Sequence, residues 1–405
     1  MRAAPVYNRG MSVHAPAATV ALGIHRLLTD ERRLVQGRRV GVLCNPASID
    51  GSFRHTADLL FEAPSVTLGA IFGPQHGFRA DVQDNMIETA HASDDRLQVP
   101  VYSLYSEVRE PTQEMLRGLD ALVVDIQDVG TRVYTFIYTV ANCMRAAARA
   151  RLPVIVCDRP NPINGLEVEG NLLQEAYASF VGQYPIPMRH GMTVGELAKL
   201  FNDIFGLNCD LHVVRMGGWR REMFYDATSL PWVMPSPNMP TLDTAIVYPG
   251  AVLFEGTQLS EGRGTTRPFE LIGAPWIDGE RLAAAMNGRG LPGVHFRPVF
   301  FEPTFQKHAK ETCGGCQLHV LDRQTFKPYR TSVELIEEFS RQSPSQFAWR
   351  EPPYEYEHEK MPIDILYGSD QLRSAIAEDQ VPALVDGWSR DEERFRRLRE
   401  PFLLY

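Results

Sequence analysis

The densest group of reactive side chains lies in residues 255–270, E-G-T-Q-L-S-E-G-R-G-T-T-R-P-F-E, which hold three carboxylates and two arginines. Glycines stand between them, and a glycine lets the backbone come close to a ligand. Carboxylates give and take protons, and an arginine binds a carboxylate through two parallel N–H groups. The segment therefore predicts a loop that binds a polar small molecule, with Glu255 and Glu261 as acid and base and Arg263 as an anion-binding group.

Five more segments are short and polar and are rich in glycine, proline or asparagine. They are residues 72–79, 125–132, 158–165, 187–191 and 235–241. His76 and Asp128 are further candidates for proton transfer. The candidates for binding a substrate are Gln75, Arg79, Asp125, Arg132, Arg159, Asn161, Arg189, His190 and Asn238.

Parallel strands would bring these segments together. The apolar runs 68–72, 121–124 and 153–157 precede the first three segments, and such runs, bounded by turn signals, are typical of buried strands. Residues 134–151 have a helical pattern, which completes a strand–loop–helix–strand unit. Because the loops of such units meet at the carboxyl edge of one sheet, we expect the candidates to face a common crevice.

The same patterns predict the remaining elements. Helices are expected at residues 19–30, 56–62, 112–118 and 193–205, the last beginning with a capping box of Thr193 and Glu196. Strands are expected at 39–44 and 120–125, and we interpret 251–254 as the end of another strand. We predict a disordered tail at 1–18, an α/β domain with a parallel-sheet core at 19–244, and a smaller mixed α/β domain at 245–405.

Composition limits the class of protein. At 405 residues the chain is long for one core, so two domains are expected. Its 44% apolar content is ordinary for a soluble globular protein, and its net charge of −9 argues against nucleic-acid binding. No apolar run reaches about 18 residues, so no membrane insertion is expected. Residues 1–18 lack the apolar core of a secretory signal, which predicts a cytoplasmic protein, or a periplasmic or secreted one if the start is misassigned.

The sequence predicts neither a metal nor a cofactor. Of the six cysteines only Cys313 and Cys316 are close together, and a zinc site needs four ligands whereas no second pair is near. Neither a G-x-G-x-x-G sequence nor a P-loop follows the expected strands, so nucleotide binding has no support.

Six motifs resemble one known family. They are, in chain order, G-P-Q-H-G-F-R, D-I-Q-D-V-G-T-R, D-R-P-N-P-I-N-G, P-M-R-H-G-M-T-V-G-E-L, P-S-P-N-M-P-T and E-G-T-Q-L-S-E-G-R-G-T-T. By these motifs the chain is similar, from about Arg39 to Tyr405, to the bacterial exo-β-N-acetylmuramidases, a family long catalogued as a domain of unknown function. The resemblance implies a Rossmann-like domain with a smaller C-terminal domain and a site in the cleft between them. It also implies a sugar or muropeptide substrate, from whose non-reducing end terminal N-acetylmuramic acid is hydrolysed.

The candidates fit that chemistry. Glycoside hydrolysis normally needs two carboxyl groups, although the acetamide of an N-acetylated sugar can replace one of them. Glu255 and Glu261 come first, with Asp125 and Asp128 as alternatives at a strand end. The arginines would bind the lactyl carboxylate of N-acetylmuramic acid, although we expect at least two of them to pair with acids and hold loops in place.

Gln75 departs from the family pattern, because many members carry glutamate there, and a glutamine cannot act as acid, base or nucleophile. The alternative interpretation is therefore a non-catalytic amino-sugar or muropeptide binder, or a hydrolase of another substrate. A nucleotide-dependent oxidoreductase or transferase is a second alternative, and the missing glycine motif counts against it.

Overall fold

The larger sheet is built from seven strands of the part of the chain that the computed structural model describes, residues 20–79 and 87–405. From one edge to the other their order is β3 (Ala92–Asp94), β4 (Val99–Ser103), β2 (Val66–Gly73), β1 (Arg38–Cys44), β5 (Ala121–Asp125), β6 (Val154–Cys157) and β9 (Leu211–Val214). Neighbours are parallel except β3 and β4. The strand order reverses between β1 and β5, as in Rossmann-like folds.

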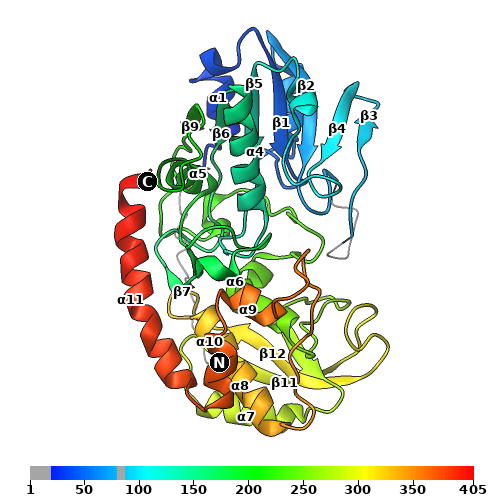
Figure 1. Ribbon diagram of the computed structural model, residues 1–405, viewed down its shortest axis with the longest axis vertical. Helices are drawn as coiled ribbons and strands as arrows, with labels where there is room; N and C mark the ends of the chain where they lie inside the picture. The colour runs from blue at the N-terminus through cyan, green and yellow to red at the C-terminus, as the bar shows by residue number, and fades with distance from the viewer. Residues whose placement is uncertain (1–19, 80–86) are drawn as a thin grey trace, which may run out of the picture.

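Helices cover both faces of this sheet (Figure 1). Successive side chains of a strand point to opposite faces. Thus Leu43 packs in one cluster with α4 (Phe136–Ala150) and α5 (Val194–Ile204). Val42 and Cys44 pack in the other cluster with α1 (Gly23–Leu28) and α2 (Thr56–Glu62). A short helix, α3 (Gln113–Leu116), precedes β5.

The lower part of Figure 1 is a smaller mixed α/β unit. Its antiparallel sheet has the order β10 (Leu271–Ala274), β12 (Cys313–Val320) and β11 (Val294–Phe301). The helices around it are α6 (Leu242–Ala251), α7 (Gly279–Gly288), α8 (Pro328–Gln342), α9 (Pro362–Tyr367) and α10 (Gln371–Ala377). A two-stranded sheet of β7 (Glu169–Leu172) and β8 (Pro187–Arg189) lies between the units. Single 3₁₀ turns occur at Arg32–Leu34, Glu175–Tyr177, Tyr225–Thr228, Val252–Gly256 and Glu400–Phe402.

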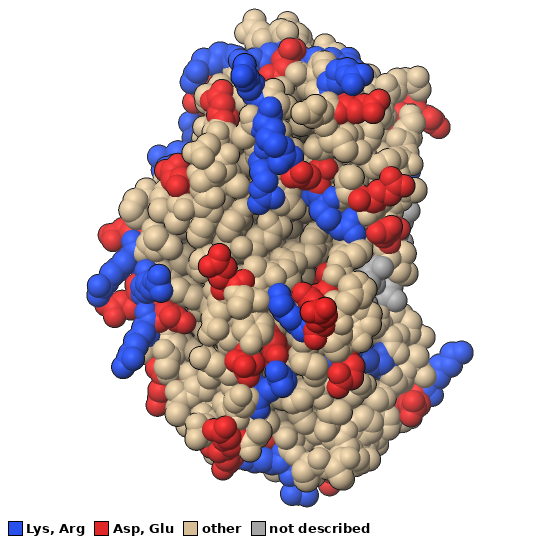
Figure 2. Space-filling model, viewed as in Figure 1, with Lys and Arg blue, Asp and Glu red and all other residues tan. Residues whose placement is uncertain are grey.

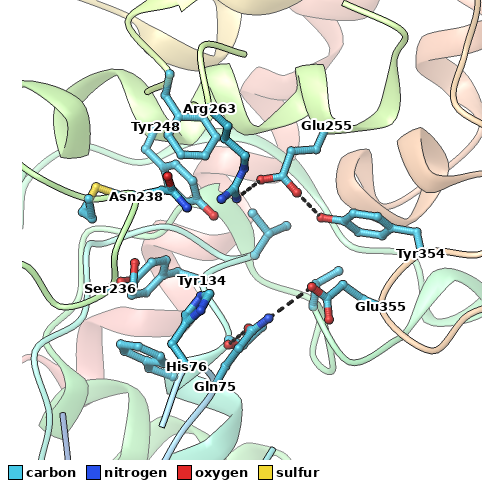
Figure 3. A pocket seen from close by; sticks show the side chains of 16 residues that line it. Gln75, His76, Tyr134, Ser236, Asn238, Tyr248, Glu255, Arg263, Tyr354 and Glu355 are labelled. Atoms are coloured by element: carbon cyan, nitrogen blue, oxygen red, sulfur yellow. Dashed lines mark hydrogen bonds and ion pairs between the residues drawn. The ribbon is translucent and has the colours of Figure 1, made fainter. Parts of the chain in front are cut away.

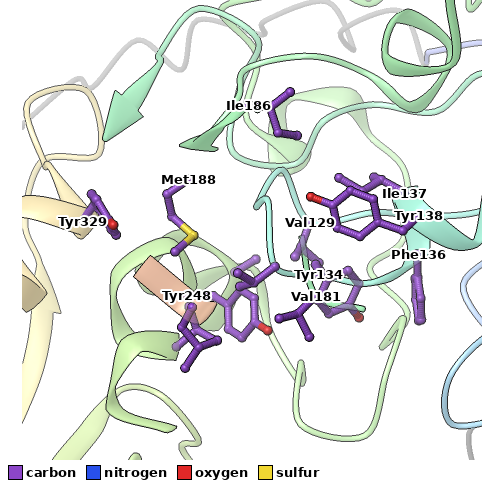
Figure 4. Packing of buried hydrophobic residues seen from close by; sticks show 14 of the residues in the cluster. Val129, Tyr134, Phe136, Ile137, Tyr138, Val181, Ile186, Met188, Tyr248 and Tyr329 are labelled. Carbon is purple, nitrogen blue, oxygen red and sulfur yellow. The ribbon is translucent and has the colours of Figure 1, made fainter. Parts of the chain in front are cut away.

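The C-terminal helix α11 (Val381–Arg399) runs along one side of the molecule and returns the chain to the larger unit (Figure 1). There the hydroxyl of Tyr405 donates a hydrogen bond of 2.8 Å to Asp158 at the end of β6. One continuous apolar cluster includes residues of both units, for example Phe136, Tyr248 and Phe339. Figure 4 shows its part around Tyr134 and Tyr248, whose rings meet edge to face with centroids 5.7 Å apart. The two units therefore share a packed core.

Most expected elements are confirmed. The predicted α/β fold is present, the helix at 56–62 is α2, and Thr193 and Glu196 form the capping box of α5. The strand expected at 251–254 is wrong, because α6 ends there and continues as a 3₁₀ turn. A short buried apolar run is compatible with a strand or a helix. Here the side chain of Thr241 caps α6 and stabilises the helix. The tail at 1–18 lies outside the described residues, and the boundary at 244 stays a prediction.

The face in Figure 2 carries acidic and basic side chains close together, and several basic side chains project on the side where Figure 1 draws α11. No helix within 20–79 and 87–405 is both long and apolar enough to cross a membrane.

Candidate active site

A polar cavity lies where the loop after β2, the start of α4 and the segments around α6 meet. The space within it that is open to a water-sized molecule is about 40 Å³. In Figure 3, Gln75 and His76 face Arg263 and Glu255 from the opposite side. Its polar and aromatic lining includes Gln75, His76, Tyr134, Ser236, Asn238, Tyr248, Glu255, Arg263, Tyr354 and Glu355.

The loop after β2 turns sharply, and this turn places Gln75 and His76 in the cavity wall. A Cβ atom at Gly73 would lie 2.6 Å from the backbone nitrogen of Phe78, so only glycine allows the chain to fold back so closely. His76 has a φ of 69°, a left-handed conformation that is uncommon for a residue other than glycine. The Thr135 hydroxyl donates to Oε1 of Gln75 at 2.8 Å. This contact fixes the amide so that its NH₂ group points at the carboxylate of Glu355, 3.1 Å away.

Glu355 enters the cavity from a tight turn of the C-terminal unit. Tyr354 and Glu357 exchange two backbone hydrogen bonds of 2.9 Å around it. The two central residues, Glu355 and Tyr356, have φ values of 45° and 68°. Such a turn normally uses asparagine or glycine, so two bulky residues here store backbone strain. Strain of this kind is concentrated at functional sites.

Two donors and deep burial set the protonation of Glu355. Its Oε2 accepts a 2.8 Å hydrogen bond from Tyr105, and its Oε1 accepts the one from Gln75. Burial disfavours the charged carboxylate and, although both hydrogen bonds favour it, the pKa of Glu355 rises to about 7. Glu355 can therefore hold a proton near neutral pH and also give it up, as a general acid must.

Opposite Glu355, the carboxylate of Glu255 is held at both oxygens. Nη2 of Arg263 lies 2.7 Å from its Oε1, and the hydroxyl of Tyr354 donates to its Oε2 at 2.7 Å. Behind it, Glu261 lies 3.3 Å from Nε of Arg263 and 2.8 Å from Nζ of Lys307. Lys307 also donates to the carbonyl oxygens of Phe254 and Leu259. Two anions and two cations thus alternate beneath the cavity wall.

Glu261 does not line the cavity, and its expected role as the acid is therefore corrected. Its side chain is 3% exposed and bound by both cations. Burial alone would raise the pKa of Glu261, but Lys307 and Arg263 outweigh burial and lower it. A carboxylate kept ionised by two buried cations is a poor proton donor. It orients Arg263 instead.

At the switch point of the sheet, between β1 and β5, described side chains pack against one another. Asp125, at the end of β5, is completely buried and makes bonds of 2.5 and 3.0 Å to the guanidinium of Arg159. The hydroxyl of Thr56 also donates to it. Asp125 and Arg159 therefore lock two loops, as we expected for at least two of the arginines, and neither faces the cavity. The ends of the parallel strands β5 and β6 place Asp125 and Arg159 side by side, and each neutralises the buried charge of the other.

Other predicted ligand groups also hold loops in place. The guanidinium of Arg132 is buried and donates to the carbonyl oxygens of Asn171, Ile186, Leu366 and Tyr367. Arg189 is buried and donates to Ile163, and Asn161 donates to Met192. Arg132 thus links the larger unit to helix α9 of the smaller one, whereas Arg189 and Asn161 join loops near the larger sheet, and none of the three lines the cavity.

Asp128, His190 and Arg79 also lie outside the cavity lining. Asp128 is buried and accepts a 2.6 Å hydrogen bond from the backbone of Gly130, while Nε2 of the buried His190 lies 3.7 Å from the same carboxylate. Arg79 is exposed and pairs with Asp94 at 3.3 Å. Of the fourteen predicted residues, the cavity thus brings together Gln75, His76, Asn238, Glu255 and Arg263.

Glu355 and its partner Tyr105 were not predicted from the sequence, and neither was Tyr354, which donates to Glu255. The surrounding sequence, E-P-P-Y-E-Y-E-H-E, contains no glycine or asparagine to mark a turn and follows no predicted strand. The alternation of tyrosine and glutamate is the one available sign, and it is equally typical of an exposed loop.

Two family models cover almost the whole chain. One, described as exo-beta-N-acetylmuramidase NamZ, N-terminal, matches residues 40–243, and its C-terminal counterpart matches residues 246–405. The chain belongs to the NamZ family of exo-β-N-acetylmuramidases. A relative, the peptidoglycan beta-N-acetylmuramidase NamZ of Bacillus subtilis (strain 168), is 44% identical over 387 residues, which are 95% of this chain and 91% of that protein.

Two solved structures share the fold of this NamZ-family chain. Both are DUF1343 family proteins of Bacteroides fragilis NCTC 9343. One is 36% identical with a TM-score of 0.86 and covers 96% of this chain and 100% of its own. The other is 28% identical with a TM-score of 0.75 and covers 95% and 99%.

No three His, Cys, Asp or Glu side chains of the described part of the chain gather as metal ligands would. Cys313 and Cys316 are buried as free thiols in strand β12 of the family's C-terminal region.

Proposed function

We propose that this protein is a glycosidase that removes terminal β-linked N-acetylmuramic acid from the non-reducing end of peptidoglycan fragments. The family and the Bacillus subtilis relative supply the reaction class. The observation that carries the proposal is the pair of carboxyl groups, Glu255 and Glu355, that line one small polar cavity. Glycoside hydrolysis requires a group that protonates the leaving oxygen, and Glu355 is suited to that task.

Glu355 is the general acid of the proposal. Burial raises its pKa to about 7, so the protonated and the ionised form are both populated near neutral pH. Tyr105 and Gln75 hold both of its oxygens, so the carboxyl group needs no reorientation before it acts. Gln75 therefore does not need to be a carboxylate, because its amide positions one.

The opposite wall suits recognition of the sugar. Arg263 reaches the cavity with its guanidinium already oriented by Glu255 and Glu261, and the lactyl carboxylate of N-acetylmuramic acid is a matching anion. Asn238 and Ser236 present polar groups, and Tyr134 and Tyr248 present aromatic rings.

The test is the release of N-acetylmuramic acid from a chromogenic β-muramide and from a disaccharide with this sugar at its non-reducing end. We expect turnover by the natural chain and a fall of about 100- to 10,000-fold in Glu355→Gln. Glu359→Gln is the matched control, because Glu359 lies exposed in the same loop. Binding of the sugar without its release, or equal loss in both variants, would contradict the proposal.

A further inference from the structure

We propose that the nucleophile of the reaction is the carbonyl oxygen of the substrate's own 2-acetamido group, and that no carboxylate of the protein attacks the sugar. The inference rests on the proposed function, which supplies an N-acetylated sugar. The hydrogen bonds and ion pairs of Glu255 and Glu355, the two carboxylates that line the cavity, support it.

Glu255 is poorly placed to attack carbon. A nucleophile must bring a lone pair of its oxygen to about 3–3.5 Å from the carbon it attacks. Both oxygens of Glu255 are bound at 2.7 Å, one to Arg263 and one to Tyr354. Both partners are themselves buried, with Tyr354 3% and Arg263 7% exposed. An attack by Glu255 would leave a buried cation or hydroxyl without its acceptor, which is costly.

The same contacts count against Glu255 as a base for direct attack by water. A base takes a proton on an oxygen that faces the water. Protonation of Glu255 would remove a counter-charge of the buried Arg263, whereas Tyr105 and Gln75, the two donors to Glu355, are uncharged. The network Lys307–Glu261–Arg263–Glu255 instead holds this carboxylate as a fixed counter-charge.

Glu355 is the other acid among the described residues that line the cavity. One carboxyl group cannot protonate the leaving oxygen and attack the sugar in the same step. It can, however, act as acid in one step and as base in the next, because burial places its pKa at about 7. A mechanism with one proton-transfer group and an internal nucleophile needs no other carboxylate.

The reaction has two steps. In the first, the acetamido oxygen forms a bond to the anomeric carbon while the glycosidic bond breaks. The bonding pair goes to the leaving oxygen, which takes the proton of Glu355, and the sugar becomes a cyclic oxazolinium. In the second, the Glu355 carboxylate takes a proton from water, whose oxygen attacks the anomeric carbon. The ring opens, the acetamide is restored, and the released sugar has the β configuration of the substrate.

The experiment uses the full-length natural protein. Proton NMR of freshly released sugar should show the β anomer first, and an α anomer would overturn the inference. Successive fluorination of the N-acetyl group should lower kcat/KM step by step, because it weakens the attacking oxygen. An unchanged kcat/KM would contradict an acetamide nucleophile. Incubation with an activated 2-deoxy-2-fluoro glycoside should leave the protein mass unchanged, whereas a covalent adduct on Glu255 would assign the attack to that residue.

Binding gives a readout that does not depend on turnover. The thiazoline of N-acetylmuramic acid mimics the cyclic intermediate, and we expect it to bind at least about 100-fold more tightly than the free sugar. Equal affinities in calorimetry would overturn the inference. A protein that cleaves muramides with inversion would keep the proposed function and lose this mechanism. A protein that cleaves none would lose the proposed function itself.

Discussion

The amide nitrogen of Gln75 lies 3.1 Å from a carboxylate oxygen of Glu355, although 280 residues separate them in the chain. The contact joins the loop after β2 to a strained turn of the C-terminal unit. It places an uncharged donor beside a carboxyl group that burial already tends to keep protonated. Gln75, which stands where many family members carry glutamate, therefore influences the protonation of Glu355.

The pH dependence of Gln75→Glu is the first prediction. Catalysis needs protonated Glu355, so activity should fall as the pH rises through about 7. A glutamate at position 75 would place a second carboxyl group beside Glu355. The two groups would then titrate as a pair, and the pKa at which the pair loses its last proton would rise. The alkaline limb of kcat/KM should therefore move to higher pH. Gln75→Leu removes the donor without adding charge and should move the limb in the same direction by less. A limb that moves to lower pH would contradict this role for Glu355.

Tyr105→Phe gives the second prediction. The Tyr105 hydroxyl stabilises the ionised form of Glu355 through a 2.8 Å hydrogen bond. Its removal should raise the pKa of Glu355 and extend activity to higher pH, with a lower kcat because the carboxyl group is less well held. Tyr102→Phe is the control, since the Tyr102 ring packs on Phe72 and His91. If Tyr105→Phe and the natural chain had identical pH profiles, the alkaline limb of kcat/KM would not report the ionisation of Glu355.

The third prediction concerns the stability of the network beneath the cavity. Lys307→Met removes one of the two cations that pair with the buried Glu261. Loss of one partner of a buried pair costs up to about 3–5 kcal/mol, and the remaining Arg263 should keep the loss toward the lower end. Denaturant unfolding measures it. Adding Glu261→Gln to Lys307→Met should recover part of the loss, because the unpaired charge is removed. Strictly additive losses would mean that the two side chains are not coupled.

The ion pair at the switch point gives the fourth prediction. Asp125→Asn would leave the fully buried Arg159 without a counter-charge and should lower the free energy of unfolding by about 3–5 kcal/mol. Glu62→Gln breaks the exposed pair with Arg54 and should cost no more than about 1 kcal/mol. At a temperature where the Asp125→Asn protein is folded, its kcat should stay near that of the natural chain. If the folded variant had no activity, Asp125 would be needed for catalysis and not only for stability.

The sequence by itself determined the elements whose signals are local. The capping box at Thr193, the helix at 56–62 and the buried parallel strands follow from periodicity and caps within a few residues. The six motifs indicated the family, and the polar loops named five residues of the cavity, among them Gln75 and Glu255.

Only the tertiary structure decided which polar residues face the ligand and which face each other. Asp125 and Arg159 look as reactive in sequence as Glu255 and Arg263, but the ends of β5 and β6 bring the first pair together as a sealed contact. Glu355 carries no local mark, because its role depends on Tyr105 and Gln75, which lie 250 and 280 residues away. Burial and long-range pairing set protonation and access, and neither is encoded within a short stretch of chain.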